Sequence, residues 1–198
     1  MDIFSSGSSL SPVPLPDGEL AWLQQLPLPY TNGEVLARLI AETDWREETV
    51  LVYGKRHLQP RLSAWYGEAG YRYSGLSLAP APLTPLLETL RGAVQDVTGH
   101  HFNSVLLNYY RNGQDSMGMH ADDEASLGPA PVIASLSFGA TRTFILRHKR
   151  SKQTLKMDLS DGSLLLMSGG TQIHWLHGIN KTAKPVGPRV NLTFRKII

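Results

Sequence analysis

The chain of 198 residues contains no cysteine. Disulfides and thiolate-bound metals are therefore excluded, and any metal ion would be held by histidine, aspartate, glutamate or other oxygen donors. No apolar run reaches the roughly 18 residues that a membrane-spanning helix needs. The opening stretch, MDIFSSGSSLSPVPLPDGE, lacks the basic and apolar regions of a secretory signal, so we expect no signal peptide and no contact with a membrane.

Charge is also scarce, at 18% of the residues, and it is unevenly placed. Residues 1–50 hold two basic and eight acidic side chains, a net charge of −6. Residues 51–198 hold seventeen basic and nine acidic side chains, a net charge of +8. A basic body beside an acidic leader favours an anionic partner, although ordinary solvated surface is the alternative that charge alone leaves open.

The first 30 residues are rich in Ser, Pro and Gly, and we expect a partly mobile, loosely packed N-terminal arm there. Residues 31–198 are expected to form a single domain. It starts with an amphipathic helix in TNGEVLARLIAETDW, where Thr31 and Glu34 have capping-box spacing. A second helix is expected in TPLLETLRGAVQDVTG, with Thr84 as its N-cap and Gly99 as its stop.

From residue 102 onward the pattern changes to short β-rich segments separated by Gly, Pro, Asp and Asn. They are SVLLNYY, PVIASLSF, RTFILRH, TLKMDLS, SLLLMSG and RVNLTFR. Helices followed by many short strands predict an α+β fold, with the helices backing one face of a mainly antiparallel sandwich or barrel.

The stretch GMHADDEASLG crowds Asp122, Asp123 and Glu124 beside His120. Neighbouring acids repel one another, but a bound cation would stabilise them. On an extended segment positions i and i+2 share a side, so His120 and Asp122 could reach one ion together. A third ligand from a distant strand would complete a 2-His-1-carboxylate site, the geometry typical of non-haem Fe(II) oxygenases.

Three later histidines are candidates for that third ligand. His148 lies in the basic run RHKRSK, where a solvated surface role is the preferred interpretation. If TQIHWLHGIN is extended, His174 and His177 point to opposite sides, so at most one of them faces a metal. Spacing alone does not choose between the two.

The last segment, PRVNLTFR, places Arg189, Asn191, Thr193 and Arg195 on one face of a strand. Two arginines on one face make a pocket for a dicarboxylate or phosphate, because each guanidinium can grip an oxyanion with two hydrogen bonds. The segment LLNYY puts Asn108 and Tyr110 together on one face in the same way.

With these motifs the chain resembles the AlkB family of Fe(II)- and 2-oxoglutarate-dependent dioxygenases, which repair alkylated nucleic acids. The matching stretches cover residues 50–198, roughly three quarters of the chain. They are VYGKRHLQPR, YRYSGLSLAP, FNSVLLNYYRNGQDSMGMHADDE, IASLSFGATRTFILRHK, GSLLLMSGGTQIHWLHGINK and PRVNLTFR. The resemblance implies a double-stranded β-helix (jelly-roll) core with two main helices packed on one side.

The resemblance also implies the site residues. Iron would be held by His120, Asp122 and His177. The co-substrate 2-oxoglutarate would contact Asn108, Tyr110, Arg189, Thr193 and Arg195, with Arg195 on its distal carboxylate, and O2 would be the second co-substrate. A nucleotide-recognition lid would span residues 50–75 or so. Substrate contacts would come from Tyr53, Gly54, Lys55, Tyr71, Arg72, Tyr73, Asp123 and Glu124.

The implied activity is oxidative demethylation of 1-methyladenine and 3-methylcytosine in DNA, releasing formaldehyde, succinate and CO2. These lesions are cationic, so Asp123 and Glu124 would stabilise them, and an aromatic pocket at Tyr71 and Tyr73 would take a flipped base. The alternatives are a 2-oxoglutarate oxygenase acting on RNA, a protein or a small metabolite, and a non-catalytic nucleic-acid-binding domain. We expect a monomer, cytoplasmic in a bacterium or nuclear in a eukaryote.

Overall fold

The computed structural model describes residues 9–52, 55–68, 71–73, 76–78 and 81–198. Its two long helices form where the sequence predicts them. Helix α1 (Asn32–Glu42) begins at the capping box of Thr31 and Glu34, in which each residue's side chain accepts a hydrogen bond from the other's backbone N–H. Helix α2 (Pro85–Thr98) starts at the Thr84 N-cap and ends at Gly99, whose φ of 70° is the left-handed conformation that glycine adopts at low cost.

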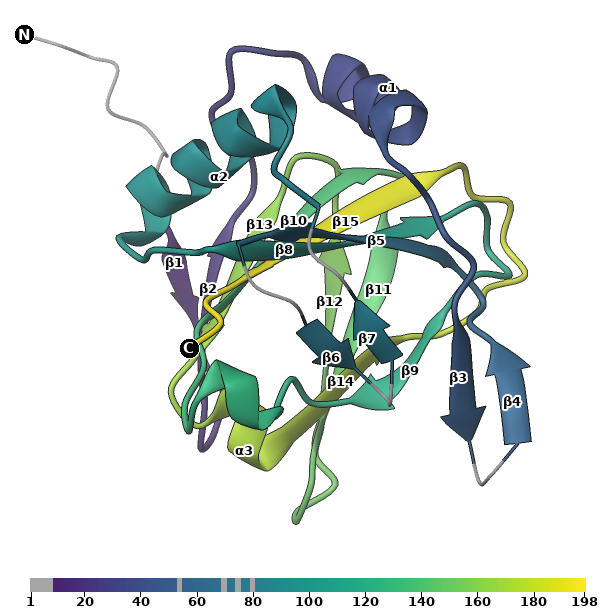
Figure 1. Ribbon diagram of the computed structural model, residues 1–198. Coiled ribbons are helices and arrows are strands. Elements are labelled where there is room, and N and C mark those ends of the chain that lie inside the picture. Colours follow the sequence, from purple (N-terminus) through teal and green to yellow (C-terminus); the bar gives the residue numbers. More distant parts are fainter. Residues whose placement is uncertain (1–8, 53–54, 69–70, 74–75, 79–80) are drawn as a thin grey trace, which may run out of the picture.

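A large antiparallel sheet crosses the middle of the molecule (Figure 1). Its strand order is β1-β2-β13-β10-β15-β8-β5. The bounds are β1 (Ser11–Val13), β2 (Glu19–Leu23), β13 (Leu164–Ser168), β10 (Ile133–Gly139), β15 (Arg189–Arg195), β8 (Ser104–Tyr110) and β5 (Leu62–Gly67). The strand β15 is an inner strand of this sheet, between β10 and β8, and all seven of its residues are buried.

A smaller antiparallel sheet has the order β12-β11-β14-β9. Its strands are β12 (Thr154–Leu159), β11 (Arg142–His148), β14 (Trp175–Ile179) and β9 (Met117–His120). Two hairpins stand apart from both sheets, β3 (Thr49–Val52) with β4 (Lys55–Leu58) and β6 (Tyr71–Tyr73) with β7 (Leu76–Leu78). Two short helices, η1 (Ala125–Leu127) and α3 (Thr171–His174), complete the described elements.

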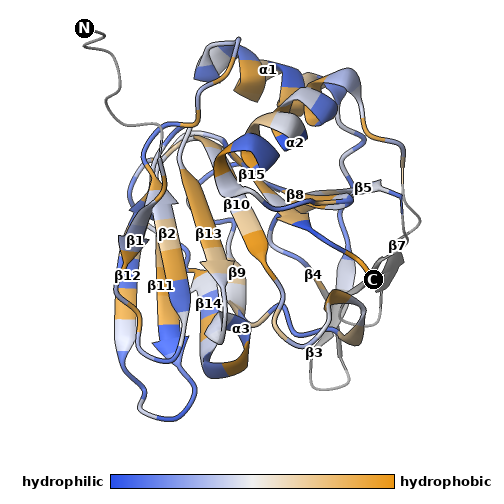
Figure 2. Ribbon diagram, turned by 90° about the vertical axis from the view of Figure 1, so that its left-hand side faces the viewer, coloured by the Kyte–Doolittle hydropathy of each residue, from blue (hydrophilic) through white to orange (hydrophobic). Residues whose placement is uncertain are grey.

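Two apolar clusters divide the interior into layers. The first lies between the large sheet and both helices, and joins Leu87 and Leu90 of α2 to Leu192 and Phe194 of β15. Figure 2 shows α1 and α2 together on the outer side of this sheet. The second cluster lies between the two sheets and includes Tyr110 and Trp175. The face of β15 that carries the arginines therefore points into the space between the sheets, away from the helices.

Residues 11–26 differ from the expectation of a loosely packed N-terminal arm. The strand β2 pairs with β13 from Glu19 to Leu23, and Leu20, Leu23 and Leu26 are at most 4% exposed. Burial of these leucines outweighs the Pro-rich composition on which the expectation rested. Residues 1–8, the other part of the proposed arm, lie outside the described residues.

The observed layers confirm the predicted α+β class and the jelly-roll core with two main helices on one side. In the part of the chain that the structure describes, no helix is long and apolar enough to span a bilayer.

Candidate active site

His120 and His177 lie opposite each other on the neighbouring strands β9 and β14. Their ring centroids are 4.4 Å apart. The strands come close here because the residue after His177 is a glycine: a Cβ on Gly178 would lie 2.8 Å from the carbonyl oxygen of Met117. The local register shift at His177 and Ile179 accompanies this approach.

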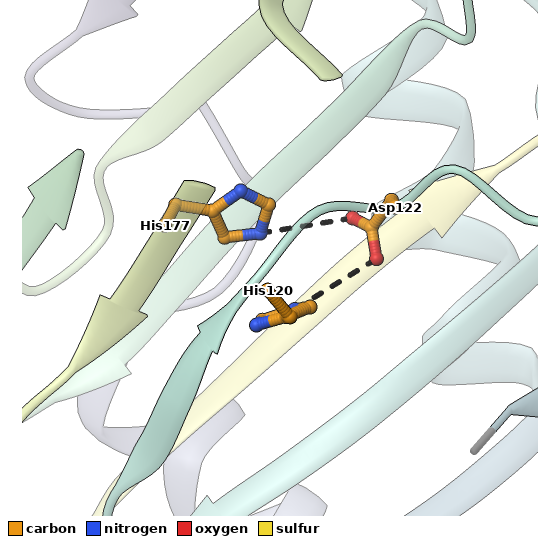
Figure 3. A group of neighbouring side chains, drawn as sticks. All are labelled: His120, Asp122 and His177. Atoms are coloured by element: carbon orange, nitrogen blue, oxygen red, sulfur yellow. Dashed lines mark ion pairs between the residues drawn. The ribbon is translucent and has the colours of Figure 1, made fainter. Parts of the chain in front are cut away.

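Asp122 completes a cluster of three metal-ligating side chains (Figure 3). It follows the end of β9 and is 1% exposed. Its Oδ1 lies 3.9 Å from His120 Nε2 and its Oδ2 lies 3.9 Å from His177 Nε2. These separations are too long for hydrogen bonds, and one ligand atom from each residue lies within 4.8 Å of the others. Such spacing suits an ion bound between the three atoms.

The protonation states of the cluster also suit a cation. Burial by itself would raise the pKa of Asp122, but the Arg195 guanidinium and the two imidazoles outweigh it and lower that pKa to about 2. Burial lowers the pKa of His177 to about 3, and the His120 ring acts in the same direction. Metal binding needs an ionised carboxylate and a neutral imidazole, and both forms are present at neutral pH.

Hydrogen bonds around the cluster leave ligand atoms available to a metal. Asp122 Oδ2 is buried and has no hydrogen-bond partner among the described residues. His120 Nδ1 lies 2.9 Å from the carbonyl oxygen of Gly118, which favours the tautomer with its proton on Nδ1. In that tautomer Nε2, the nitrogen nearer to Asp122, carries the lone pair that can bind a metal. Two imidazole nitrogens and one carboxylate oxygen are the donor set of the 2-His-1-carboxylate Fe(II) site, so the residues fit that metal.

The other two candidate histidines lie elsewhere. The segment around His174 is not extended as assumed, because residues 171–174 form α3, and His174 stacks on His148 with ring centroids 6.1 Å apart. The solvated role expected for His148 is wrong, since His148 is 5% exposed and its Nδ1 accepts hydrogen bonds from the backbone of Arg150 and Ser151. Neither residue joins the metal-ligating cluster.

A pocket between the sheets connects this cluster with the polar face of β15. Four of the five residues predicted to bind 2-oxoglutarate line it together with His120, Asp122 and His177; the four are Tyr110, Arg189, Thr193 and Arg195. Asn108, the fifth, is buried on the same strand face as Tyr110. Its Oδ1 accepts a hydrogen bond of 2.7 Å from Arg61 Nε, and its Nδ2 has no hydrogen-bond partner among the described residues.

Arg189 is a buried cation with hydrogen-bonding capacity to spare. It is 1% exposed, and its Nη2 donates to Ser137 Oγ over 3.0 Å. Its Nε and Nη1 have no hydrogen-bond partner among the described residues. Burial lowers its pKa to about 10, so the guanidinium stays charged at neutral pH. A buried cation with two unmet donors is a site for a carboxylate.

Arg195 holds a different position from the expected one. Its Nη2 donates to Asp122 Oδ1 over 2.8 Å, with both side chains almost fully buried. This bond places Arg195 at the metal end of the pocket, whereas the resemblance had put it on a distal carboxylate. Arg195 follows Arg189 by six positions, which separates the two residues by roughly 20 Å along an extended strand. The two arginines therefore lie at opposite ends of β15 and cannot both contact the same carboxylate.

Two buried polar residues of this region were not assigned roles from the sequence. Arg61, which bonds Asn108, is 4% exposed. Asn191 lines the pocket, and its Nδ2 donates to Ser135 Oγ and to the carbonyl oxygen of Leu136. For Asn191 the sequence did carry a signal, because alternation along β15 places it on the same face as the two arginines. Arg61 stands alone at a strand start, where no pattern marks it.

The two acids after Asp122 differ in environment. Asp123 is exposed, with its Oδ2 3.8 Å from Lys149 Nζ. Glu124 is half-buried at the start of η1. Of the other predicted substrate contacts, Tyr53 and Gly54 lie outside the described residues. Lys55 is placed in β4, and Tyr71, Arg72 and Tyr73 are placed in β6, but only their backbones are described.

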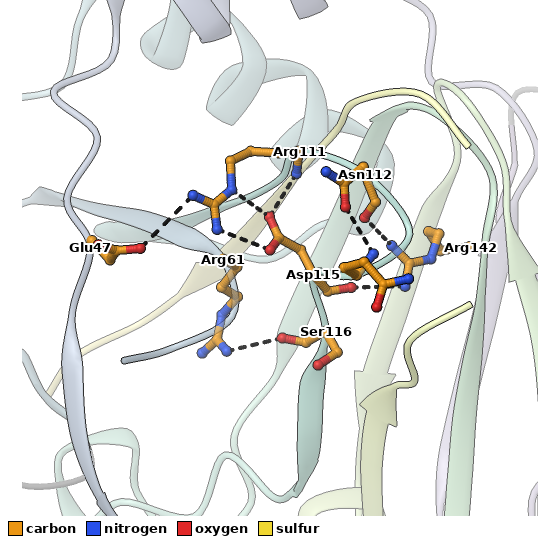
Figure 4. A network of polar contacts seen from close by, with 8 residues as sticks. Glu47, Arg61, Arg111, Asn112, Asp115, Ser116 and Arg142 are labelled. Carbon is orange, nitrogen blue, oxygen red and sulfur yellow. Dashed lines mark hydrogen bonds and ion pairs between the residues drawn. The ribbon is translucent and has the colours of Figure 1, made fainter. Parts of the chain in front are cut away.

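A polar network holds the turn between β8 and β9, the strands that end at Tyr110 and His120 (Figure 4). Arg142 is 4% exposed and donates to the backbone carbonyls of Asn112, Asp115 and Asn180, over 3.2, 2.9 and 2.6 Å. Arg111 grips the carboxylate of Asp115 with two bonds of 2.8 and 3.0 Å. Arg142 therefore ties this turn to the residue that follows β14.

Comparison with known proteins agrees with this geometry. Residues 19–195 match the model of the 2OG-Fe(II) oxygenase superfamily. Human alpha-ketoglutarate-dependent dioxygenase alkB homolog 3 is 44% identical over 82% of the chain and 60% of its own length. Mouse DNA oxidative demethylase ALKBH2 is 48% identical over 75% of the chain and 66% of its own length.

A solved structure of OsALKBH1 aligns with a TM-score of 0.66 at 17% identity, over 93% of this chain and 100% of that one, which shows a shared fold. The chain spans about 60 to 66% of the length of these two curated relatives. The family match covers nearly the whole described chain and includes every residue of the metal-ligating cluster. The chain belongs to the 2OG-Fe(II) oxygenase superfamily and, within it, to the AlkB family of dioxygenases.

Proposed function

We propose that this chain is a DNA oxidative demethylase that removes methyl groups from 1-methyladenine and 3-methylcytosine. The observation that carries the proposal is the single pocket in which three metal-ligating side chains and the buried Arg189 meet. The mouse relative is named a DNA oxidative demethylase, which supports DNA as the substrate.

In this proposal His120, Asp122 and His177 hold Fe(II). Bound iron, with 2-oxoglutarate and O2, supplies the oxidation that turns an N-methyl group into formaldehyde while 2-oxoglutarate becomes succinate and CO2. The chain keeps His177 neutral by burial and Asp122 ionised through Arg195, so neither ligand must lose a proton at neutral pH. The three ligands line the same pocket as Arg189, and the co-substrate would reach the metal from this pocket.

Arg189 binds the distal carboxylate of 2-oxoglutarate through its Nε and Nη1 donors. The keto-acid end then lies toward Asp122 and Arg195, at the other end of the pocket lining. Tyr110 supports this orientation, because the Arg189 guanidinium carbon lies 5.1 Å from the centre of its ring. A buried ion pair of this kind excludes water and fixes the co-substrate in one direction.

The methylated base would enter beside the acidic loop. Cationic lesions favour a nearby carboxylate, and Glu124 is the better placed of the two acids because it is half-buried and Asp123 faces Lys149. Residues of β4 and β6 belong to the proposed lid, which would hold the flipped base. We also infer that the chain acts as a monomer.

Succinate release tests this function. The parent protein should release succinate with DNA oligonucleotides that carry 1-methyladenine, in the presence of Fe(II), and much less with unmethylated DNA or without iron. His177→Ala should abolish release, whereas His174→Ala should keep it, because His174 stacks on His148 outside the cluster. A preference for methylated RNA oligonucleotides would reassign the substrate, and equal release on methylated and unmethylated strands would refute the proposal.

A further inference from the structure

Gln172 connects the two segments that carry the metal-ligating residues. It lies in α3, directly before β14 and His177. Its side chain is buried, and its Oε1 accepts a hydrogen bond of 3.0 Å from the backbone N–H of Asp122, 50 residues away. The direction of this bond also fixes the orientation of the amide, because a backbone N–H can only donate.

The remaining polar groups of Gln172 are also engaged. Its Nε2 lies 3.6 Å from Met167 Sδ, and Met167 lines the pocket. Its backbone carbonyl accepts a hydrogen bond of 3.0 Å from Lys149 Nζ, which also lies 3.8 Å from Asp123 Oδ2. The acidic loop is therefore attached to α3 directly at Asp122, and through Lys149 at Asp123.

Asp122 needs such an attachment because it lies beyond the ladder of β9. The last paired residue of β9 is His120, opposite His177. Past this point, Gln172 holds Asp122 at its backbone and Arg195 holds it at its carboxylate. A rotation of the Asp122 backbone would move Oδ2 away from His177 Nε2, which now lies 3.9 Å from it.

We propose that Gln172 is a positioning residue of the metal centre, which sets the direction of the Asp122 carboxylate by bonding its backbone N–H. The inference rests on the metal site of the proposed function and adds a residue to it. It acts through Asp122 and does not touch the metal. Partners of this kind around metal ligands typically contribute tenfold to a hundredfold in metal affinity.

The test compares metal affinity in Gln172→Met with the parent. Methionine keeps the length of the side chain and packs beside Met167, but its thioether is a poor acceptor for the Asp122 N–H. Titration of the metal-free proteins with Co(II) under anaerobic conditions, followed by visible absorption, reports both affinity and ligand geometry. We expect affinity to fall by about tenfold or more and the absorption spectrum of bound Co(II) to change.

Two further variants separate positioning from packing. Gln172→Glu keeps an acceptor oxygen at the same place and should recover most of the lost affinity. Gln153→Met makes the same substitution at an exposed loop position and should bind Co(II) like the parent. Urea unfolding of each metal-free variant shows whether the fold is retained.

If Gln172→Met does not fold, hydrogen exchange in the metal-free parent decides the question. The Asp122 amide should then exchange slowly, as a buried and bonded N–H does. Fast exchange, or a folded Gln172→Met with parental affinity and spectrum, would overturn the inference. If the inference fails but the parent binds Co(II) and His177→Ala does not, the proposed metal site is still supported. A parent that binds no Co(II) would refute both the metal site and the role of Gln172.

Discussion

Arg189 and Arg195 share one face of β15, yet the structure gives them different partners. Arg195 bonds the metal-ligating Asp122, and Arg189 keeps two donors without a hydrogen-bond partner among the described residues. Arg189→Met should therefore raise the 2-oxoglutarate concentration for half-maximal turnover by about tenfold or more, because a charge-assisted pair is worth roughly 1.5–3 kcal/mol. Steady-state titration of 2-oxoglutarate measures this.

Arg147→Met is the matched control, since Arg147 is exposed on β11. It should leave the 2-oxoglutarate requirement unchanged. An unchanged requirement in Arg189→Met would show that the distal carboxylate binds elsewhere on the pocket wall.

The two acids after Asp122 should contribute unequally to lesion recognition. Glu124→Gln should slow demethylation of 1-methyladenine and 3-methylcytosine by about tenfold, which corresponds to about 1.4 kcal/mol in the barrier. The reason is that a half-buried carboxylate favours a cationic base. Asp123→Asn should have a smaller effect, because Asp123 is exposed and faces Lys149.

A neutral lesion such as 1-methylguanine is the comparison, measured by the rate of repair of matched oligonucleotides. Its repair should fall less than that of the cationic lesions in Glu124→Gln. Equal losses on neutral and cationic lesions would mean that these acids shape the loop and that lesion charge is read by other residues.

Sequence patterns placed several of the pocket-lining residues on shared strand faces but did not show how their side chains pair. Alternation along β15 placed Arg189, Asn191, Thr193 and Arg195 on one face, and the structure keeps that face in the pocket. Parity left His174 and His177 undecided, because it says only that they point to opposite sides of an extended segment. No pattern announced that residues 171–174 form a short helix instead. The bond from Gln172 to Asp122 joins residues 50 positions apart and has no local signal.

At the scale of the elements, Arg142 secures the turn between β8 and β9. Arg142→Met would leave the backbone carbonyls of Asn112, Asp115 and Asn180 without this donor. The free energy of unfolding should fall by about 3 kcal/mol, because each bond to a charged donor contributes roughly 1.5–3 kcal/mol and such contributions overlap. Urea denaturation of the metal-free protein measures the change.

Arg111→Gln is the comparison at the same turn. Its guanidinium also bonds Asp115, but 41% of the side chain is exposed, so the loss should stay below about 1 kcal/mol. Equal losses of unfolding free energy in the two variants would contradict the idea that burial makes the Arg142 bonds the stronger ones.

Elements with strong local signals were predicted well. The helices were marked by caps at Thr31 and Thr84, and β8, β11 and β15 have the expected bounds. The strands β1 and β2 were missed, since they are three and five residues long and lie in a Pro-rich stretch. The strand β2 is held by pairing with β13, more than 140 positions later, which no local pattern reports, and β1 is held by pairing with β2.

For the whole molecule, the metal-free protein should lose stability as the solution becomes acidic. The pKa of His177 is about 3 in the folded state and 6.5 as its ordinary value. Below pH 6.5 the unfolded chain takes up this proton and the folded chain does not, so stability falls as pH drops from 6.5 toward 3. One such group contributes at most about 1.4 kcal/mol per pH unit.

Urea unfolding in the presence of a chelator, at pH 7.5 and pH 5, measures this dependence. His177→Gln removes the imidazole and should make the loss of stability between the two pH values smaller than in the parent. An identical loss in both proteins would show that His177 is not held neutral by burial.

In the proposed function, the cluster of His120, Asp122 and His177 carries out oxidative demethylation of DNA. Mass spectrometry of a DNA oligonucleotide with one 1-methyladenine tests it most directly, after incubation with the parent, Fe(II), 2-oxoglutarate and O2. The oligonucleotide should lose its methyl group, with one formaldehyde and one succinate formed per repaired base, and His177→Ala should leave it methylated. A parent that leaves the methyl group in place while consuming 2-oxoglutarate, or a His177→Ala variant that removes it, would contradict the claim.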